Sequence, residues 1–285
     1  MDRKAVARET LRIMDQGYYE YEGQKVSIQS DMDASVDKSR LITPDEGATL
    51  LERYVGGTCT KTLEVRVENL STVDAIRKLA QEGRENIGVL NFASAKNPGG
   101  GFINGAMAQE ESLAASSILY RTLTAHEAYY RNNRAQTSMM YTDHAIYSPD
   151  VAFFRDGRFR LVEKPVKASV LTLPAVNMGQ VVLKGEDPAE AERVMRRRMA
   201  LALAVFAYQG ARHLVLGAYG CGVFRNDPCL IATWWKELLA ESVGDYFDSV
   251  FHAVLDRSKT ESCIQAFEII TNPAARKETM ELWKR

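Results

Sequence analysis

Residues 91–101 read Asn-Phe-Ala-Ser-Ala-Lys-Asn-Pro-Gly-Gly-Gly, and Gln-Glu-Glu follows at positions 109–111. The stretch continues from an apolar run, residues 87–92, whose composition predicts a buried strand. Consecutive glycines weaken helices and strands, so we expect them where the backbone approaches another group closely and offers it N–H groups. Pyrophosphate is a common occupant of such a loop. Two acids in the first turn of a helix can also simply complement its dipole, without any function.

A second glycine-containing loop, from Gly217 to Pro228, lies between the apolar run 213–217 and a predicted helix. A strand–glycine–helix unit offers backbone amides to phosphate, and two such loops in one sheet could hold one diphosphate from both sides. The ring of Phe224 is suited to packing on a ribose. Cys221 is interpreted as a small residue between glycines, because no histidine follows in a Cys–His pattern. The loop matches neither a Walker motif nor the Rossmann fingerprint.

The pattern Asn-x-Ala-Ser-Ala-x-Asn-Pro-Gly-Gly-Gly followed by Gln-Glu-Glu-Ser-Leu resembles the signature of the bacterial-type poly(ADP-ribose) glycohydrolases. These are catalytic members of the macrodomain fold, and the resemblance covers most of the chain. It implies an α/β fold, a three-layer α/β/α macrodomain with a mixed central sheet and an N-terminal helical extension. It also implies an enzyme, a glycosidase that hydrolyses ribose–ribose O-glycosidic bonds of poly(ADP-ribose) and releases ADP-ribose.

The adjacent carboxylates Glu110 and Glu111 are the predicted catalytic residues. The reaction needs a proton for the leaving oxygen, stabilisation of an oxocarbenium-like centre and a water at C1. Neighbouring side chains can reach one ribose but not its opposite faces, which fits an acid/base beside a positioning acid. The resemblance implies that Glu111 transfers the proton and Glu110 grips ribose hydroxyls. Their protonation states stay open, because the helix N-terminus favours the carboxylate whereas crowding and desolvation favour the acid.

The predicted ligand-binding residues lie in the two loops and beside them: Asn91, Asn97, Gly99, Gly100, Gly101, Gln109, Gly220, Cys221, Gly222, Val223 and Phe224. Asn97 is expected on the same ribose or, alternatively, as a turn residue before Pro98. Asn91 could bond either the loop or the ligand. The resemblance places Gly220 to Phe224 on the diphosphate, with Phe224 beside the ribose that is attacked. Candidate adenine contacts are Phe153, Phe154 and Tyr219.

Composition restricts the partners and the location. The net charge is −1 over 285 residues, so no global field attracts a polyanion, and we expect no direct nucleic-acid binding. The four cysteines are widely spaced without a CxxC pair, which favours a reducing, cytoplasmic location. The four histidines share no ligand spacing, so we expect no metal and no cofactor. The longest apolar run, residues 199–208, is too short for a bilayer, and we predict neither a targeting peptide nor membrane contact.

Strands alternate with helices along the chain, which predicts ligand loops at the carboxyl ends of the strands. We expect residues 1–60 to form an N-terminal extension packed on the main domain, and residues 61–285 to form the macrodomain catalytic core. Predicted helices cover residues 3–16, 71–81, 111–123, 126–134, 188–209, 228–241 and 262–270. Predicted strands cover residues 61–67, 87–92, 145–155, 168–173, 213–217 and 249–255.

Two other functions compete with the polymer hydrolase. One is a macrodomain reader that holds ADP-ribose without cleaving it, and the other is a hydrolase that removes mono-ADP-ribose from proteins. The intact Gln-Glu-Glu favours an enzyme, because a reader needs no pair of acids at the reactive ribose. The expected partners are poly(ADP-ribose), ADP-ribose and ADP-ribosylated proteins. The sequence leaves open whether the polymer is cut from its ends or internally.

Overall fold

The computed structural model of the chain describes residues 2–271, and contacts divide the protein into two compact units. The first unit comprises residues 1–43, 72–136 and 142–174, and the second comprises residues 44–71, 137–141 and 175–285. The expected division into residues 1–60 and 61–285 stays a prediction, and its last residues, 272–285, lie outside the described part.

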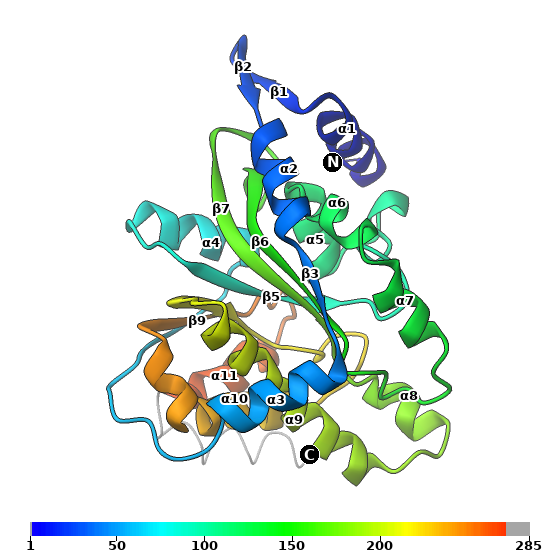
Figure 1. Ribbon diagram of the computed structural model, residues 1–285, viewed down its shortest axis with the longest axis vertical. Helices are drawn as coiled ribbons and strands as arrows, with labels where there is room; N and C mark the ends of the chain where they lie inside the picture. Colours follow the sequence, from blue (N-terminus) through cyan, green and yellow to red (C-terminus); the bar gives the residue numbers. More distant parts are fainter. Residues whose placement is uncertain (1, 272–285) are drawn as a thin grey trace. The chain divides into compact units, whose positions relative to one another are not determined.

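A mixed seven-stranded sheet accompanied by helices confirms the expected fold class (Figure 1). Its strand order is β3-β6-β7-β5-β8-β9-β4. The first unit contains β3 (Arg40–Ile42), β6 (Ala145–Arg155), β7 (Leu161–Pro174) and β5 (Ile87–Ala93). The second contains β8 (His213–Leu216), β9 (Ser249–Ala253) and β4 (Glu64–Glu68). Pairing is parallel for β5–β7, β8–β9 and β4–β9, and antiparallel for β3–β6 and β6–β7.

Strand β5 positions the signature loop at its carboxyl end. Every residue of β5 except Phe92 is buried, as an apolar run in a strand covered on both faces requires. Its parallel register with β7 sets Asn91 opposite Thr172. Helices α4 (Thr72–Gln81) and α5 (Gln109–Ser116) both contact β5. The buried strand therefore gives the loop and the start of α5 a rigid support.

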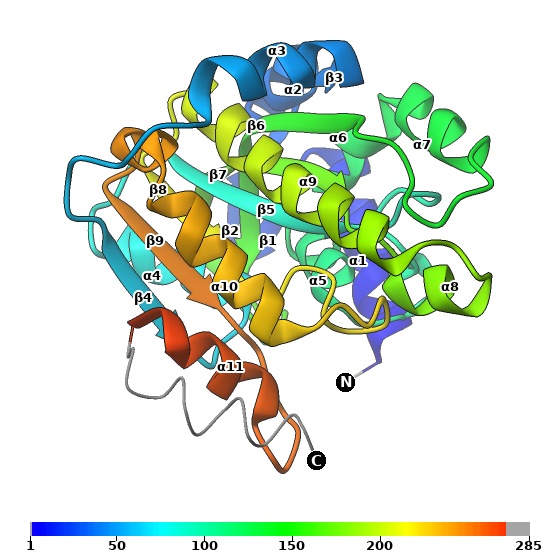
Figure 2. The same cartoon turned by 90° about the horizontal axis from the view of Figure 1, so that it is seen from below.

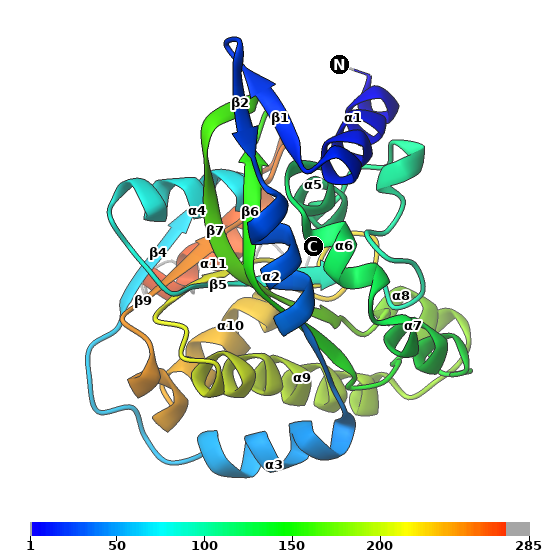
Figure 3. The same ribbon diagram turned by 45° about the horizontal axis from the view of Figure 1, so that its top comes forward.

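Helix α1 (Arg3–Gln16) has the predicted bounds: Asp2 caps its start, and Gly17 ends it with a φ of 74°. Its residue Ala7 packs with Phe102, Ala114 and Ala115 of the signature segment. The chain continues into the hairpin of β1 (Tyr18–Tyr21) and β2 (Gln24–Ser27), and then into α2 (Gln29–Lys38), which contacts β6. Figure 3 shows α1 and the hairpin side by side. The amino-terminal helix thus supports the signature segment from outside.

The helix predicted over residues 111–123 is wrong as one element, because it is interrupted at Ser117. Helix α5 ends at Ser116, and α6 (Leu119–Thr124) follows. Ser117 is extended, with a φ of −149°, and pairs with Phe153. Its hydroxyl donates to the Leu113 carbonyl and accepts from the Leu119 amide, so the side chain replaces helical backbone bonds. Two further elements of this unit are η1 (Phe102–Asn104) and α7 (Glu127–Arg134).

The second unit carries five helices among its described residues: α3 (Pro44–Tyr54), α8 (Met178–Leu183), α9 (Pro188–Tyr208), α10 (Pro228–Leu239) and α11 (Ser262–Thr271). Helix α9 begins as predicted, with Asp187 as the cap and Pro188 in the first turn. Helices α9 and α10 lie side by side in Figure 2. Across residues 2–271, no helix combines the length and the apolar character that a bilayer crossing requires.

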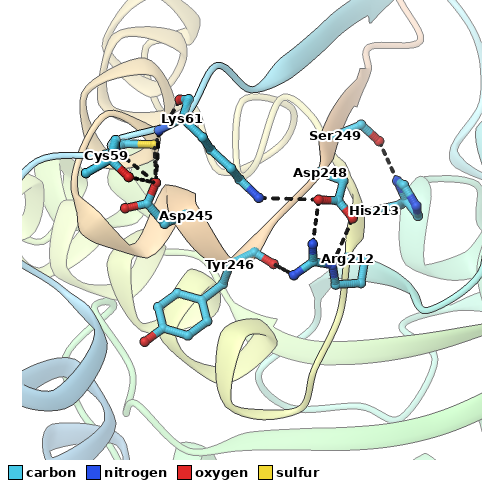
Figure 4. A network of polar contacts seen from close by, with 9 residues as sticks. Cys59, Lys61, Arg212, His213, Asp245, Tyr246, Asp248 and Ser249 are labelled. Carbon is cyan, nitrogen blue, oxygen red and sulfur yellow. Dashed lines mark hydrogen bonds and ion pairs between the residues drawn. The ribbon is translucent and has the colours of Figure 1, made fainter.

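Polar contacts fix the chain where it enters β4 (Figure 4). The Asp245 carboxylate, in the 3-10 helix η2 (Ser242–Tyr246), accepts from the Cys59 thiol and from the amides of Thr60 and Lys61. Asp248 accepts from the guanidinium of Arg212. These bonds anchor the segment before the edge strand β4 on the second unit.

Candidate active site

Glu110, in the first turn of α5, is buried, with 3% of its surface exposed. One carboxylate oxygen accepts from the Ser94 amide at 2.6 Å, and the other lies 3.3 Å from Nδ2 of Asn91. Burial raises the pKa of Glu110 to about 8, and the charge of Glu111 adds to this rise, although the hydrogen bonds from Ser94, Asn91 and Gly99 lower it. The acid form of Glu110 therefore predominates at neutral pH.

A protonated Glu110 needs a hydrogen-bond acceptor, and Asn91 can supply one. Asn91 is fully buried, and its Oδ1 has no partner among the described residues. Its Nδ2 lies 3.1 Å from the Thr172 hydroxyl as well as near Glu110. Turning the amide over would place Oδ1 where it accepts from both hydroxyl groups. Within this unit Asn91 contacts Glu110, and its contact with the ligand stays a prediction.

Glu111 is only partly buried, and both of its carboxylate oxygens hold the loop. Oε1 accepts from the Gly101 amide at 3.0 Å, and Oε2 accepts from the Ala108 amide at 3.0 Å. The second bond is the reach-back of an N3 glutamate to the N-cap amide. Each oxygen keeps a second lone pair, so the carboxyl group can still exchange a proton with a ligand.

The glycines allow the loop to pass directly over the two carboxyl groups. A Cβ on Gly100 would lie 2.3 Å from Oε1 of Glu111 and 3.3 Å from Oε2 of Glu110, and Gly100 has a φ of 59°. A Cβ on Gly99 would press against Phe102 and Ala114. The predicted close approach of backbone is therefore present, but the group that is approached is the glutamate pair.

The amides of this loop are used inside the protein. Gly99 donates to Glu110, Gly100 to the Asn97 carbonyl at 3.0 Å, and Gly101 to Glu111. In this arrangement the loop orients carboxyl groups and offers no free N–H at these three positions. Direct ligand contacts of the three glycines stay a prediction.

Gln109 connects the start of α5 to β5. Its Oε1 accepts from the Phe92 amide at 2.9 Å, and its Nε2 donates to the Leu90 carbonyl at 2.8 Å. The side chain therefore extends the hydrogen bonding of the strand and positions the two glutamates that follow it. These two hydrogen bonds give Gln109 a structural role, and its contact with the ligand stays a prediction.

Asn97 has an exposed side chain, while its backbone forms the turn before Pro98. Its amide donates to the Ser94 hydroxyl at 3.1 Å, and its carbonyl accepts from Gly100. The structure thus supports the turn role and leaves the side chain accessible for a ligand.

The second loop, residues 217–228 of the other unit, differs from the first because several of its backbone amides have no hydrogen-bond partner in the described residues. The amides of Gly222, Val223 and Phe224 make no hydrogen bond within residues 2–271, and Gly222 and Val223 are exposed. Val223 keeps 85% of its surface exposed. Three successive unpaired N–H groups are the kind of backbone arrangement that binds an anion.

Asn226 shapes this loop from beneath. It is buried, and its Nδ2 donates to the carbonyls of Val176 and Gly220 at 2.8 and 3.0 Å. A Cβ on Gly220, which has a φ of 74°, would lie 2.6 Å from that nitrogen. Neither Asn226 nor Ser94 was predicted from the sequence to support a loop. Their signal was weak, because Asn and Ser are common in turns with no such role.

Aromatic residues separate into accessible and buried ones. The Phe224 ring is partly exposed and lies 6.3 Å from the Tyr141 ring. Phe153, Phe154 and Tyr219 are fully buried, so the expectation that they contact adenine is wrong. They are core residues. His252 is likewise buried, and burial lowers its pKa to about 3.

Comparison with known proteins identifies the class to which this fold and site belong. A family model for the catalytic domain of microbial-type poly(ADP-ribose) glycohydrolase (PARG) matches residues 7–156. The PARG crystal structure from Thermomonospora curvata is 38% identical, with a TM-score of 0.90, over 94% of this chain and 98% of that one. A structure of the same enzyme with the inhibitor ADP-HPD is 39% identical, covers 93% and 98% of the two chains, and has a TM-score of 0.87.

The PARG of Deinococcus radiodurans in complex with ADP-ribose is 41% identical over 85% of this chain and 97% of that one, with a TM-score of 0.79. A comparison with curated proteins gave no match. These similarities identify the chain as a glycoside hydrolase. The chain belongs to the microbial-type poly(ADP-ribose) glycohydrolase family.

Proposed function

We propose that this enzyme hydrolyses the ribose–ribose O-glycosidic bonds of poly(ADP-ribose) and releases ADP-ribose, with Glu111 as the acid/base. The observation that carries the proposal is the packing of Gly100 against both carboxyl groups. This packing holds two acids beside one glycine loop. ADP-ribose and ADP-HPD are bound by the similar enzymes, which supports the same ligand class here.

The two glutamates have different roles in this proposal because their surroundings differ. Glu111 is partly exposed and delivers a proton to the leaving ribose oxygen; as a carboxylate it then activates the water that attacks C1. Glu110 is buried, and in its acid form it places no negative charge beside Glu111. Glu110 positions ribose hydroxyls and, through the amides that it binds, the loop itself.

The diphosphate is assigned to the second loop and the reactive ribose to the first unit. Unpaired amides at Gly222, Val223 and Phe224 support the first assignment. The accessible ring of Phe224 supports contact with a ribose. Within the first unit, the exposed side chain of Asn97 supports contact with a ligand. Each assignment rests on contacts within a single unit.

ADP-ribosylated proteins are proposed as carriers of the polymer, and the cytoplasm is the proposed location. The four cysteines are all free, as a reducing compartment maintains them. The rival activities, a reader and a hydrolase of mono-ADP-ribosylated proteins, are tested by the same substrates. Labelled polymer distinguishes release of ADP-ribose from binding alone, and a mono-ADP-ribosylated protein tests the second rival.

The decisive variant is Glu111→Gln, which removes the proton-transferring group but keeps the shape of the side chain. General acid–base help is worth roughly 10²–10⁴ in rate, so hydrolysis of labelled polymer should fall by that factor. Calorimetry should show ADP-ribose affinity within a few-fold of the wild type. Glu85→Gln, at an exposed position of the same unit, is the matched control for the charge change. Retained hydrolysis by Glu111→Gln would assign the acid to another residue.

A further inference from the structure

The segment before Tyr141, residues 138–140 of the second unit, is held by charged side chains of that unit. The Glu186 carboxylate accepts from the Met139 amide at 3.0 Å. The Met140 carbonyl accepts from Nη1 of Arg198 at 2.8 Å, and Arg198 is buried, with 1% of its surface exposed. Hydrogen bonds to charged groups are stronger than those between neutral groups. The next residue, Tyr141, therefore has a well-defined position on this unit.

Tyr141 has an unusual backbone conformation. Its φ is 57°, in the left-handed region, which bulky residues rarely adopt. Such a conformation costs free energy relative to the ordinary one, and it recurs at ligand-binding positions, where the side chain is held in a particular place. Glycine would take the same φ without strain. The presence of tyrosine here therefore indicates a use for its side chain.

The Tyr141 side chain is accessible to a ligand. It is partly exposed, and its hydroxyl makes no hydrogen bond within residues 2–271. Its ring centroid lies 6.3 Å from that of Phe224, at an interplanar angle of 42°, which is the spacing of an aromatic pair. Both residues belong to the second unit, and the amide of Phe224 is one of the three unpaired N–H groups of residues 222–224. A phenolic hydroxyl without a protein partner thus lies beside the proposed diphosphate loop.

We propose that Tyr141 binds the substrate: its ring and the ring of Phe224 form a wall for the distal ribose of ADP-ribose, and its hydroxyl bonds to a hydroxyl of that ribose. This inference rests on the proposed function, which assigns the diphosphate to the amides of residues 222–224. A ribose joined directly to that diphosphate lies beside the side chain of Phe224. The phenol both donates and accepts, as ribose hydroxyls do, and its ring covers the apolar side of the sugar. The wall fixes the orientation in which C1 of the ribose is presented.

The test measures the binding of ADP-ribose and of ADP to the full chain by calorimetry, because ADP keeps the diphosphate and lacks the distal ribose. Tyr141→Phe removes one hydrogen bond and should weaken ADP-ribose binding about 2- to 10-fold. Tyr141→Gly removes the ring as well, while glycine keeps the φ of 57° without strain, and should weaken ADP-ribose binding at least about 10-fold. Both variants should bind ADP as tightly as the wild type.

Tyr208→Phe is the matched control, since Tyr208 is an exposed tyrosine of the same unit. This control should bind both nucleotides like the wild type. Unchanged affinity of Tyr141→Gly for ADP-ribose would overturn the proposal. Equal losses of affinity for ADP-ribose and for ADP would show that Tyr141 only shapes the diphosphate loop, and would overturn the proposal too. Failure of the wild type to bind ADP-ribose would instead contradict the proposed function.

Discussion

Replacing Gly100 with alanine should damage the site because the new methyl group would collide with the carboxyl group of Glu111. The new Cβ would lie 2.3 Å from Oε1 and 2.9 Å from Cδ of Glu111, so the carboxyl group must move. The left-handed backbone, with a φ of 59°, adds about 1–2 kcal/mol of strain. Losing the bond from Gly101 to Glu111 adds about 1.5–3 kcal/mol at most, because Glu111 is partly exposed. We expect Gly100→Ala to lower the free energy of unfolding by roughly 2.5–5 kcal/mol.

The effect on turnover should be larger than the effect on folding. A displacement of about 1 Å at a catalytic group can cost about 10²-fold in rate, which a polymer hydrolysis assay measures easily. Gly83→Ala is the matched control: Gly83 has a φ of 76°, and its Cβ would meet no described atom within 4 Å. The control should lose about 1–2 kcal/mol and keep full activity. Equal stability and equal rates for the two variants would refute the close-packing explanation.

Three further predictions address other parts of the site. Val223→Pro removes one unpaired N–H and should weaken ADP-ribose binding about 10-fold by calorimetry. Val223→Ala should bind with unchanged affinity, because the side chain is exposed. Equal affinities for the two variants would show that the ligand does not bind these amides. Gln109→Ala removes the hydrogen bonds to the Phe92 amide and the Leu90 carbonyl and should cost about 1–3 kcal/mol in urea unfolding; an unchanged free energy of unfolding would contradict the positioning role of Gln109. The pKa of Glu110 is raised to about 8 in the folded protein, so its contribution to stability is present below pH 4.5 and is lost as pH rises through 8. The stability of Glu110→Gln relative to the wild type should therefore increase by a few kcal/mol between pH 4.5 and about 8. Curves of unfolding free energy against pH that stay parallel for the two proteins would contradict this.

Helices and strands were predicted best from the sequence where an apolar period is bounded by capping or helix-terminating residues. Helix α1 has a capping aspartate and a terminal glycine, and α9 has Asp187-Pro188, so their starts were readable. Strand β5 was evident as an apolar run. Helix α2 was missed because it buries only Met32 and Ser35 and shows little apolar periodicity. Helix α8 was missed because it is six residues long and exposes its apolar Val182 and Leu183.

The sequence indicated two glycine loops and two adjacent glutamates, but it did not indicate the hydrogen bonds that these residues make. From the sequence, both glycine loops were predicted to offer backbone amides to phosphate. The amides of Gly99, Gly100 and Gly101 in the first loop are bound within the protein, whereas three amides of the second loop are not. That difference depends on where Glu110 and Glu111 point, which spacing does not determine.

The most direct test is a crystal structure of this enzyme with ADP-ribose bound. We predict that the Glu111 carboxyl group lies within hydrogen-bond reach, about 2.6–3.2 Å, of the oxygen on C1 of the distal ribose. A Glu111 carboxyl group still bound only to Gly101 and Ala108, and well beyond that reach, would contradict its role as the acid/base.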